Sequence, residues 1–191
     1  MKKLLLTILS ILLGLNICIA STEELSKQAT AFYSDNNFNK TLDLLLQINE
    51  KERSAQDWLL LGNLLQEKGE KNNAIFMYQK AINTDEKYYK AYYNLGNIYL
   101  NDDKYNMALE NYKKAEKLNK TNPYLYYKLA CVYIKLADLK NAKTALIKAV
   151  TIKNDIPEIH YNLAYVYKCL NKPKIAQQYL DNYNKLVTEN F

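Results

Sequence analysis

The sequence predicts an all-α protein built as a solenoid of about five stacked helical hairpins. Leucines, alanines and aromatic residues recur along the chain at one fixed interval, and within each interval the apolar residues keep helical spacing. The 191 residues contain only four glycines and three prolines, which disfavours a turn-rich all-β fold. The chain is long enough for one domain of ordinary size.

Four columns of residues carry the repeat. Leu61, Leu95, Leu129 and Leu163 are each 34 residues apart, without a slip. The same interval separates Ala74, Ala108, Ala142 and Ala176; Trp58, Tyr92, Tyr126 and His160; and Leu65, Tyr99, Tyr133 and Tyr167. Four columns in phase over four units identify an internal repeat, in which each unit buries its apolar face against its neighbours.

Each unit is predicted to be two helices joined by a turn. Tyr92, Leu95, Gly96 and Tyr99 stand at i, i+3, i+4 and i+7, which places them on one helical stripe. Ala108, Tyr112 and Ala115 form a second stripe, and the polar residues 101–104 separate the two.

Glycine and proline positions agree with these boundaries. Pro123 and Pro157 are placed in the first turn of a helix, where the missing N–H removes no hydrogen bond. Gly69 falls where the first helix of its unit should end. Gly62 and Gly96 lie inside predicted helices, so we expect the two helix backbones of each unit to approach closely there.

The 34-residue pattern resembles the tetratricopeptide repeat family. Clear units span 55–88, 89–122, 123–156 and 157–190, and a weaker first unit covers about 22–54. In that first unit Gln28 replaces the leucine and Thr41 the alanine. The resemblance implies a right-handed α-solenoid over residues 21–191, with a concave face that binds an extended peptide or a partner's helix.

The resemblance also implies that the groove is lined by the first helix of each unit, off its Leu/Tyr stripe. By spacing, the lining residues are Leu59, Asn63, Gln66, Lys90, Tyr93, Asn94, Asn97, Asn101, Tyr124, Tyr127, Lys128, Cys131, Lys135, Glu158, Tyr161, Asn162, Tyr165 and Lys168. Asparagine amides offer a donor and an acceptor to a peptide backbone, and tyrosines offer rigid contact area. The alternative for each tyrosine is a packing role.

Some family members clamp a terminal carboxylate with lysine, asparagine and arginine. Asn63, Asn94 and Lys128 fall on matching positions, but Leu59 and Tyr124 stand where that clamp has lysines. The sequence therefore disfavours a clamp of this kind.

The last unit departs from the pattern, because Tyr183 stands where an alanine is expected and no further helix follows it. A repeat array normally ends in a cap with a polar outer face. A possible oligomer or partner edge is formed by Tyr179, Leu180, Tyr183, Leu186 and Val187. The alternative is that tyrosine hydroxyls and lysine stems cover this end adequately.

Residues 1–20 have the pattern of a secretory signal peptide. Lys2 and Lys3 precede an apolar run from Leu4 to Leu13, and residues 18–20 suit cleavage after Ala20. The mature protein would begin at Ser21 and be periplasmic or secreted. The alternative is an uncleaved membrane anchor; lipid attachment at Cys18 is disfavoured because Ile17 is not small.

The remaining cysteines, Cys131 and Cys169, are predicted to stay free. They are one repeat plus one helical turn apart in sequence. Lateral helix spacing of about 9 Å and an axial offset of about 6 Å separate their Cα atoms by roughly 11 Å. A disulfide does not span that distance.

Composition disfavours nucleic-acid binding and catalysis. Without Lys2 and Lys3 the 26 basic residues become 24 against 20 acidic ones, and Arg53 is the only arginine. His160, the only histidine, lies in a packing column, and neither a metal-ligand cluster nor a glycine-rich phosphate loop is found. We therefore expect a non-enzymatic protein with no cofactor, metal or small-molecule substrate, which binds a protein or peptide. It would serve either as a soluble adaptor or as a structural subunit of an envelope assembly.

Overall fold

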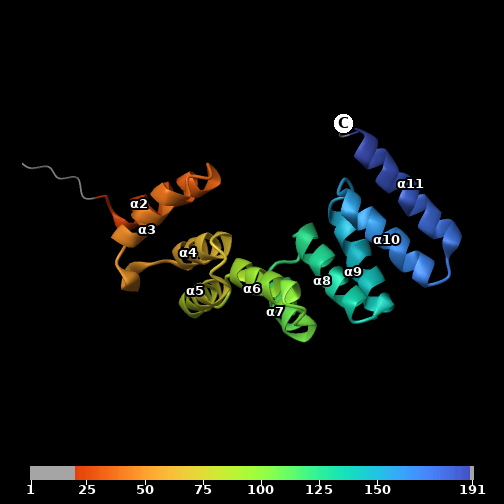
Figure 1. The fold of residues 1–191 in the computed structure, drawn as a ribbon, viewed down its shortest axis with the longest axis horizontal. Helices are drawn as coiled ribbons and strands as arrows, with labels where there is room; N and C mark the ends of the chain where they lie inside the picture. The colour runs from red at the N-terminus through yellow and green to blue at the C-terminus, as the bar shows by residue number, and fades with distance from the viewer. Residues whose placement is uncertain (1–19, 190–191) are drawn as a thin grey trace, which may run out of the picture. The chain divides into compact units, whose positions relative to one another are not determined.

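The computed structural model describes residues 20–189, and within this range it is entirely helical (Figure 1). In chain order the elements are α2 (Thr22–Ser34), α3 (Phe38–Gln47), the 3-10 helix η1 (Glu50–Glu52), α4 (Ala55–Glu67), α5 (Lys71–Thr84), α6 (Tyr89–Asn101), α7 (Tyr105–Leu118), α8 (Pro123–Lys135), α9 (Leu139–Ile152), α10 (Pro157–Cys169) and α11 (Pro173–Glu189). The predicted all-α fold of helical hairpins is confirmed for the described residues. The predicted signal segment lies outside them, apart from Ala20.

The chain forms two compact units that divide between Arg53 and Ser54. In the first unit α2 packs against α3, with Ala29, Leu45 and Ile48 in its core. Thr41, which replaces the expected alanine, is fully buried. Its hydroxyl donates to the backbone oxygen of Asn37 at 2.9 Å, so the extra polar atom of this weaker repeat has a partner.

The second unit contains four hairpins that pack in sequence. Each first helix packs on its own second helix, and α5, α7 and α9 also pack against the first helix of the next hairpin. The repeating leucines and alanines form the shared core, in which Ala74, Ala108 and Ala142 are fully buried and Leu163 has no exposed surface. The helices therefore pack one on the next from α4 to α11 (Figure 1).

The helix starts follow local sequence rules. Ser54 and Asp57 form a capping box at the start of α4, with reciprocal hydrogen bonds between side chain and backbone. Pro123 and Pro157 are the first residues of α8 and α10, as predicted.

Each hairpin turn contains one residue with a left-handed backbone. These residues are Asn36, Gly69, Asp103, Ala137 and Asn171, with φ between 55° and 78°. Gly69 follows the end of α4, as predicted, and is the only glycine among them. Five turns with the same conformation at the same point show that all five hairpins share one design.

The groups nearest to Gly62 and Gly96 are tyrosine side chains and not the helix backbone that was predicted to approach them. A Cβ built on Gly62 would lie 2.4 Å from Cε1 of Tyr78, and one on Gly96 would lie 2.5 Å from Cε1 of Tyr112. Each glycine thus makes room for a tyrosine ring of the second helix rather than for its backbone. Both tyrosines are fully buried, so each ring is part of the core of its hairpin.

Candidate functional site

The predicted groove residues lie on the first helices α4, α6, α8 and α10 of the second unit. On the α4 and α6 portion, Asn63 and Asn94 contact each other: Asn94 Nδ2 donates to Asn63 Oδ1 at 2.8 Å. The hydroxyl of the buried Tyr78 of α5 lies 2.8 Å from the same Asn63 oxygen and 3.0 Å from Gln66 Oε1, so these two amide oxygens share its single proton. Tyr78 of the second helix thus joins Asn63 and Gln66 of the predicted groove, and Asn63 in turn joins Asn94.

Tyr112 repeats this arrangement one hairpin later. Its hydroxyl donates to Asn97 Oδ1 at 2.7 Å, and its ring lies 5.9 Å from that of Tyr93. Burial raises the pKa of Tyr112 well above 10, and it also raises the pKa of Tyr93. Both phenols therefore remain protonated at neutral pH and serve as hydrogen-bonding groups.

The roles of Tyr78 and Tyr112 were not predicted from the sequence. Each follows a mid-helix glycine by 16 residues, and each hydroxyl reaches an asparagine located one residue after that glycine. This paired spacing was the available signal.

On α8 and α10 the polar contact involves a thiol. Asn162 Nδ2 donates to Cys131 Sγ at 3.7 Å. The two residues are 31 positions apart in sequence, the same separation as between Asn94 and Asn63. Burial raises the pKa of the Cys131 thiol, so it is neutral at pH 7. Burial likewise raises the pKa of Tyr127. Cys131 and Cys169 are both free, with Cys131 half-buried and Cys169 exposed.

Aromatic side chains with a large exposed area gather on the same two helices. Tyr124 on α8 is 48% exposed, and Tyr161 and Tyr165 on α10 are 53% and 48% exposed. The other exposed members of the predicted groove are Gln66, Lys90, Asn101, Lys135, Glu158 and Lys168; the half-buried ones are Asn63, Tyr93, Asn94, Asn97, Tyr127, Lys128, Cys131 and Asn162.

Leu59 is a correction to the predicted groove, because it is buried with only 5% exposed. It occupies the column of Tyr93, Tyr127 and Tyr161, but unlike them it has no polar end to hold in water. The neighbouring Leu60 and Leu61 are buried as well, so α4 has a wider apolar face than the helices that follow it.

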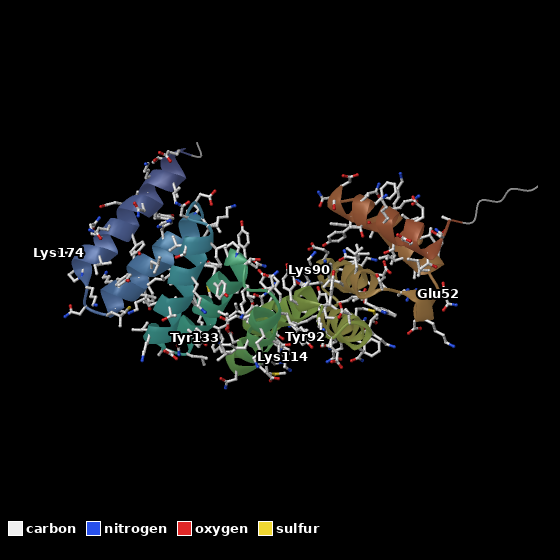
Figure 2. All side chains as sticks on the ribbon, turned by 180° about the vertical axis from the view of Figure 1, so that it is seen from behind. Glu52, Lys90, Tyr92, Lys114, Tyr133 and Lys174 are labelled. Carbon is white, nitrogen blue, oxygen red and sulfur yellow. The ribbon has the colours of Figure 1, made fainter. Side chains whose placement is uncertain are left out.

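Another face of the second unit carries a row of lysines over aromatic rings. Lys80 Nζ lies 5.6 Å from the ring centre of Trp58, Lys114 Nζ 5.9 Å from Tyr92, and Lys148 Nζ 5.1 Å from Tyr126. Figure 2 shows Tyr92 and Lys114 together, on the side of the ribbon away from Lys90. The lysines therefore cover the bulky packing column, which supports their interpretation as a solvated surface.

These features agree with a comparison against known families. A family described as the tetratricopeptide repeat protein 21 C-terminal ARM domain matches residues 15–163, more than half of the chain. The chain belongs to this tetratricopeptide repeat family. No curated protein matches it by sequence.

Solved structures show the same repeat fold. A structure of MamA MSR-1 superposes with a TM-score of 0.71 at 16% identity, covering 89% of this chain and 98% of MamA. Another MamA crystal structure gives 0.73 at 21%, with coverage of 85% and 95%. PilF of Pseudomonas aeruginosa gives 0.76 at 18%, with coverage of 86% and 75%. At these identities the likeness concerns the fold alone.

His160 has a packing position in its tetratricopeptide repeat. It is 5% exposed, and its Nε2 lies 2.6 Å from the backbone oxygen of Asn154. Its ring centre is 6.0 Å from that of Tyr179. Within residues 20–189 no three histidine, cysteine or acidic side chains are placed to hold a metal ion. None of the helices in the same range has the length and apolar character needed to cross a bilayer.

The predicted C-terminal edge of the repeat array is half-buried in the structure. Tyr179 stacks on Tyr167 with ring centres 5.5 Å apart, and Tyr183 lies 5.4 Å from Tyr161. Leu180, Leu186 and Val187 are also half-buried. Two aromatic rings of α11 thus lie against rings of α10.

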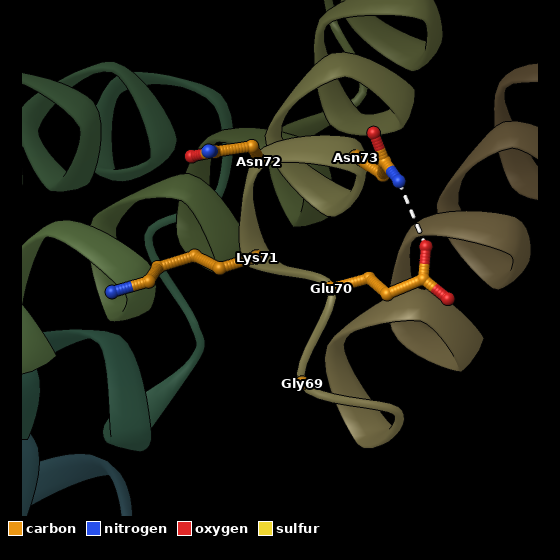
Figure 3. Close-up of a pocket in the computed structure, with 5 residues that line it drawn as sticks. All are labelled: Gly69, Glu70, Lys71, Asn72 and Asn73. Carbon is orange, nitrogen blue, oxygen red and sulfur yellow. Dashed lines mark hydrogen bonds between the residues drawn. The ribbon is translucent and has the colours of Figure 1, made fainter.

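A hollow of about 410 Å³ lies at the turn between α4 and α5 (Figure 3). Five consecutive residues, Gly69 to Asn73, form it, and Asn73 Nδ2 donates to Glu70 Oε2 at 2.7 Å. A similar hollow of about 400 Å³ lies at residues 35–39, the corresponding turn of the first repeat. Its recurrence marks it as a feature of the repeat's turn and not as a particular binding site.

Proposed function

We propose that the protein is a non-catalytic scaffold that binds an extended segment of another protein on the face formed by α4, α6, α8 and α10. Residues of this face are held in place before any partner arrives. The Asn63–Asn94 and Cys131–Asn162 contacts join neighbouring first helices, and Tyr78 and Tyr112 support Asn63 and Asn97 from behind. Preorganised side chains lose less entropy on binding.

The observation that carries this proposal is the combination of supported amides and exposed rings on one set of helices. Asn94 uses only its Nδ2 atom in the contact above, so its amide oxygen can accept a hydrogen bond from a peptide backbone. Asn162 is held more tightly, because its side chain contacts both Cys131 and Tyr127. Tyr124, Tyr161 and Tyr165 add exposed aromatic area next to them. A peptide would therefore gain both backbone hydrogen bonds and apolar contacts.

Photo-crosslinking tests this assignment directly. The crosslinking amino acid p-benzoylphenylalanine would replace Tyr161 in one variant and Phe76 in another. Phe76 is the matched control, since it is 52% exposed but lies on the second helix α5. We expect the Tyr161 variant to capture a partner from the native cell envelope and the Phe76 variant to capture none. Capture from position 76 alone would assign binding to a different face.

We further propose that the protein acts outside the cytoplasm after removal of residues 1–20. The basic start and apolar run of this segment support export. Mass spectrometry of the protein purified from its native cells should find Ser21 as the first residue. An intact Met1 would instead support a membrane-anchored form.

The second candidate function is assembly into an envelope complex through α11. One observation favours it: Ala176 is the only buried residue of this 17-residue helix. Within residues 20–189 no helix follows α11. Light scattering at tens of micromolar would show a dimer or larger species under this proposal, and a monomer would count against self-assembly.

A further inference from the structure

The residue types at one pair of packing positions differ between the hairpins of the second unit. In the first two of its hairpins a glycine of the first helix faces a tyrosine 16 residues later, as Gly62 faces Tyr78 and Gly96 faces Tyr112. The next two hairpins have alanine and leucine at these positions. Leu146, in the third hairpin, is fully buried like the tyrosines, whereas Leu180, in the last, is only half-buried.

A cavity of about 390 Å³ opens at this position in the last hairpin. It lies between α10 and α11, and its walls are formed by Tyr161, Ala164, Tyr165, Lys168, Pro173, Ala176, Gln177 and Leu180. Leucine is smaller than tyrosine, and α11 is the last helix of the described residues, so neither a ring nor a further helix fills the space. Its size is within the range of small-ligand pockets.

The lining of the cavity indicates what it accepts. Most of the wall is aromatic or aliphatic, and two of its rings, Tyr161 and Tyr165, belong to the proposed binding face. Lys168 is the only charged lining residue and is exposed. The nearby carboxylate of Asp181 accepts a hydrogen bond from Gln177 Nε2 at 2.8 Å and does not line the cavity. Lys168 therefore gives the lining of the cavity a positive charge.

We propose that this cavity receives one aromatic side chain of the bound segment, with an acidic residue beside it held by Lys168. The inference rests on the proposed peptide-binding function and specifies its partner chemistry. The apolar wall selects the ring, and the lysine selects the adjacent carboxylate over a basic residue. The cavity would then act as the anchoring point at the C-terminal end of the binding face.

A fluorinated peptide provides a probe for this cavity. The probe is the acetylated and amidated peptide Ser-Gly-(4-fluoro-Phe)-Glu-Gly-Ser, observed by fluorine NMR with about 1 mM protein, because a single short anchor binds weakly. We expect a concentration-dependent shift of the fluorine resonance. Replacing the peptide's glutamate by lysine should weaken binding several-fold, since an exposed ion pair contributes little more than that. No shift, or an equal shift with lysine, would overturn the proposal.

A double variant fills the cavity from within. Ala164→Gly combined with Leu180→Tyr recreates the Gly96–Tyr112 arrangement and should weaken probe binding about tenfold or more. The matched control is Ala130→Gly combined with Leu146→Tyr, which makes the same exchange one hairpin earlier and should leave binding unchanged. Circular dichroism establishes that both remain folded.

The exposed substitution Lys168→Glu gives an independent test that does not alter the core. It should reverse the preference between the glutamate and lysine peptides. Equal binding by the filled variant, or an unchanged preference in Lys168→Glu, would overturn the cavity assignment. The partner crosslink from position 161 would remain in that case, which separates failure of this inference from failure of the proposed function.

Discussion

The ring of Tyr112 lies directly against the α-carbon of Gly96, so that a Cβ added there would be 2.5 Å from the ring. The tyrosine is fully buried, and its hydroxyl extends past the glycine to Asn97 at 2.7 Å. One pair of residues thus joins the core of the hairpin to the polar face that we propose binds a partner.

We expect Gly96→Ala to destabilise the protein by about 1–3 kcal/mol. Alanine is the better helix former by about 1 kcal/mol, but its methyl group forces the buried ring or the helix to shift. Urea unfolding measures the loss. The double variant Gly96→Ala/Tyr112→Leu copies the natural Ala130–Leu146 pair and should recover part of the stability of Gly96→Ala. Simple additivity of the two changes would contradict this packing relationship.

The turn residue Ala137 offers a stabilising substitution. Its φ of 58° is unfavourable for alanine and unrestricted for glycine. Ala137→Gly should raise the free energy of unfolding by about 0.5–1 kcal/mol. Gly69→Ala is the reverse control: φ is 78° there, and nothing lies within 4 Å of an added Cβ. Gly69→Ala should lower the free energy of unfolding by a similar amount. Thermal unfolding measures both variants, and unchanged midpoints would contradict the strain at this turn.

Tyr112→Phe should cost about 1 kcal/mol near pH 8, because Asn97 Oδ1 loses its donor. Burial raises the pKa of Tyr112 above 10, so the wild-type stability from this group is complete below pH 10. It declines above that pH as the phenol ionises in the unfolded chain. The phenylalanine variant lacks this decline. The difference in free energy of unfolding between wild type and variant, measured by denaturant unfolding, should therefore shrink between about pH 9 and 11. Parallel pH profiles would exclude this assignment.

Glu116 of α7 joins two lysines, Lys113 at 2.9 Å and Lys148 of α9 at 3.1 Å. Burial acts to raise its pKa, but the two lysines outweigh burial and lower it. The group therefore contributes stability above the unfolded pKa near 4.5, and this is lost as pH falls through the folded pKa. Glu116→Gln should cost about 0.5–1 kcal/mol at pH 7 and nothing near pH 2. Urea titrations at both pH values test this, and an equal cost at each would contradict it.

The two thiols should differ in reactivity. Cys169 is exposed, whereas Cys131 is half-buried and accepts a hydrogen bond from Asn162, and burial raises its pKa. Iodoacetamide at pH 8 should therefore alkylate Cys169 first. Peptide mapping over time identifies the modified residue. Unfolding in urea should equalise the two rates, and faster labelling of Cys131 in the native protein would contradict its placement.

Residues that face the common core were predictable from spacing alone. Leu129 and Ala142 are buried because a 34-residue period keeps the apolar stripes of successive hairpins in register. Pro123 and Gly69 likewise mark their helix ends through local backbone preference. Leu59 was placed wrongly because spacing gives the angle of a residue around its helix but not which neighbouring groups cover it.

The period, the helical hairpins and the family follow from the amino-acid sequence alone, because helix formation and turn chemistry depend on residues close together in the chain. Three features emerge only from the packing of the helices: the ring that fills the space beside Gly96, the atoms that support Asn63 and Asn97, and the cavity beside Leu180. These features depend on side chains from separate helices occupying one volume. Periodicity predicts the helix face on which each side chain lies, but it does not predict which residues of the next helix that side chain contacts.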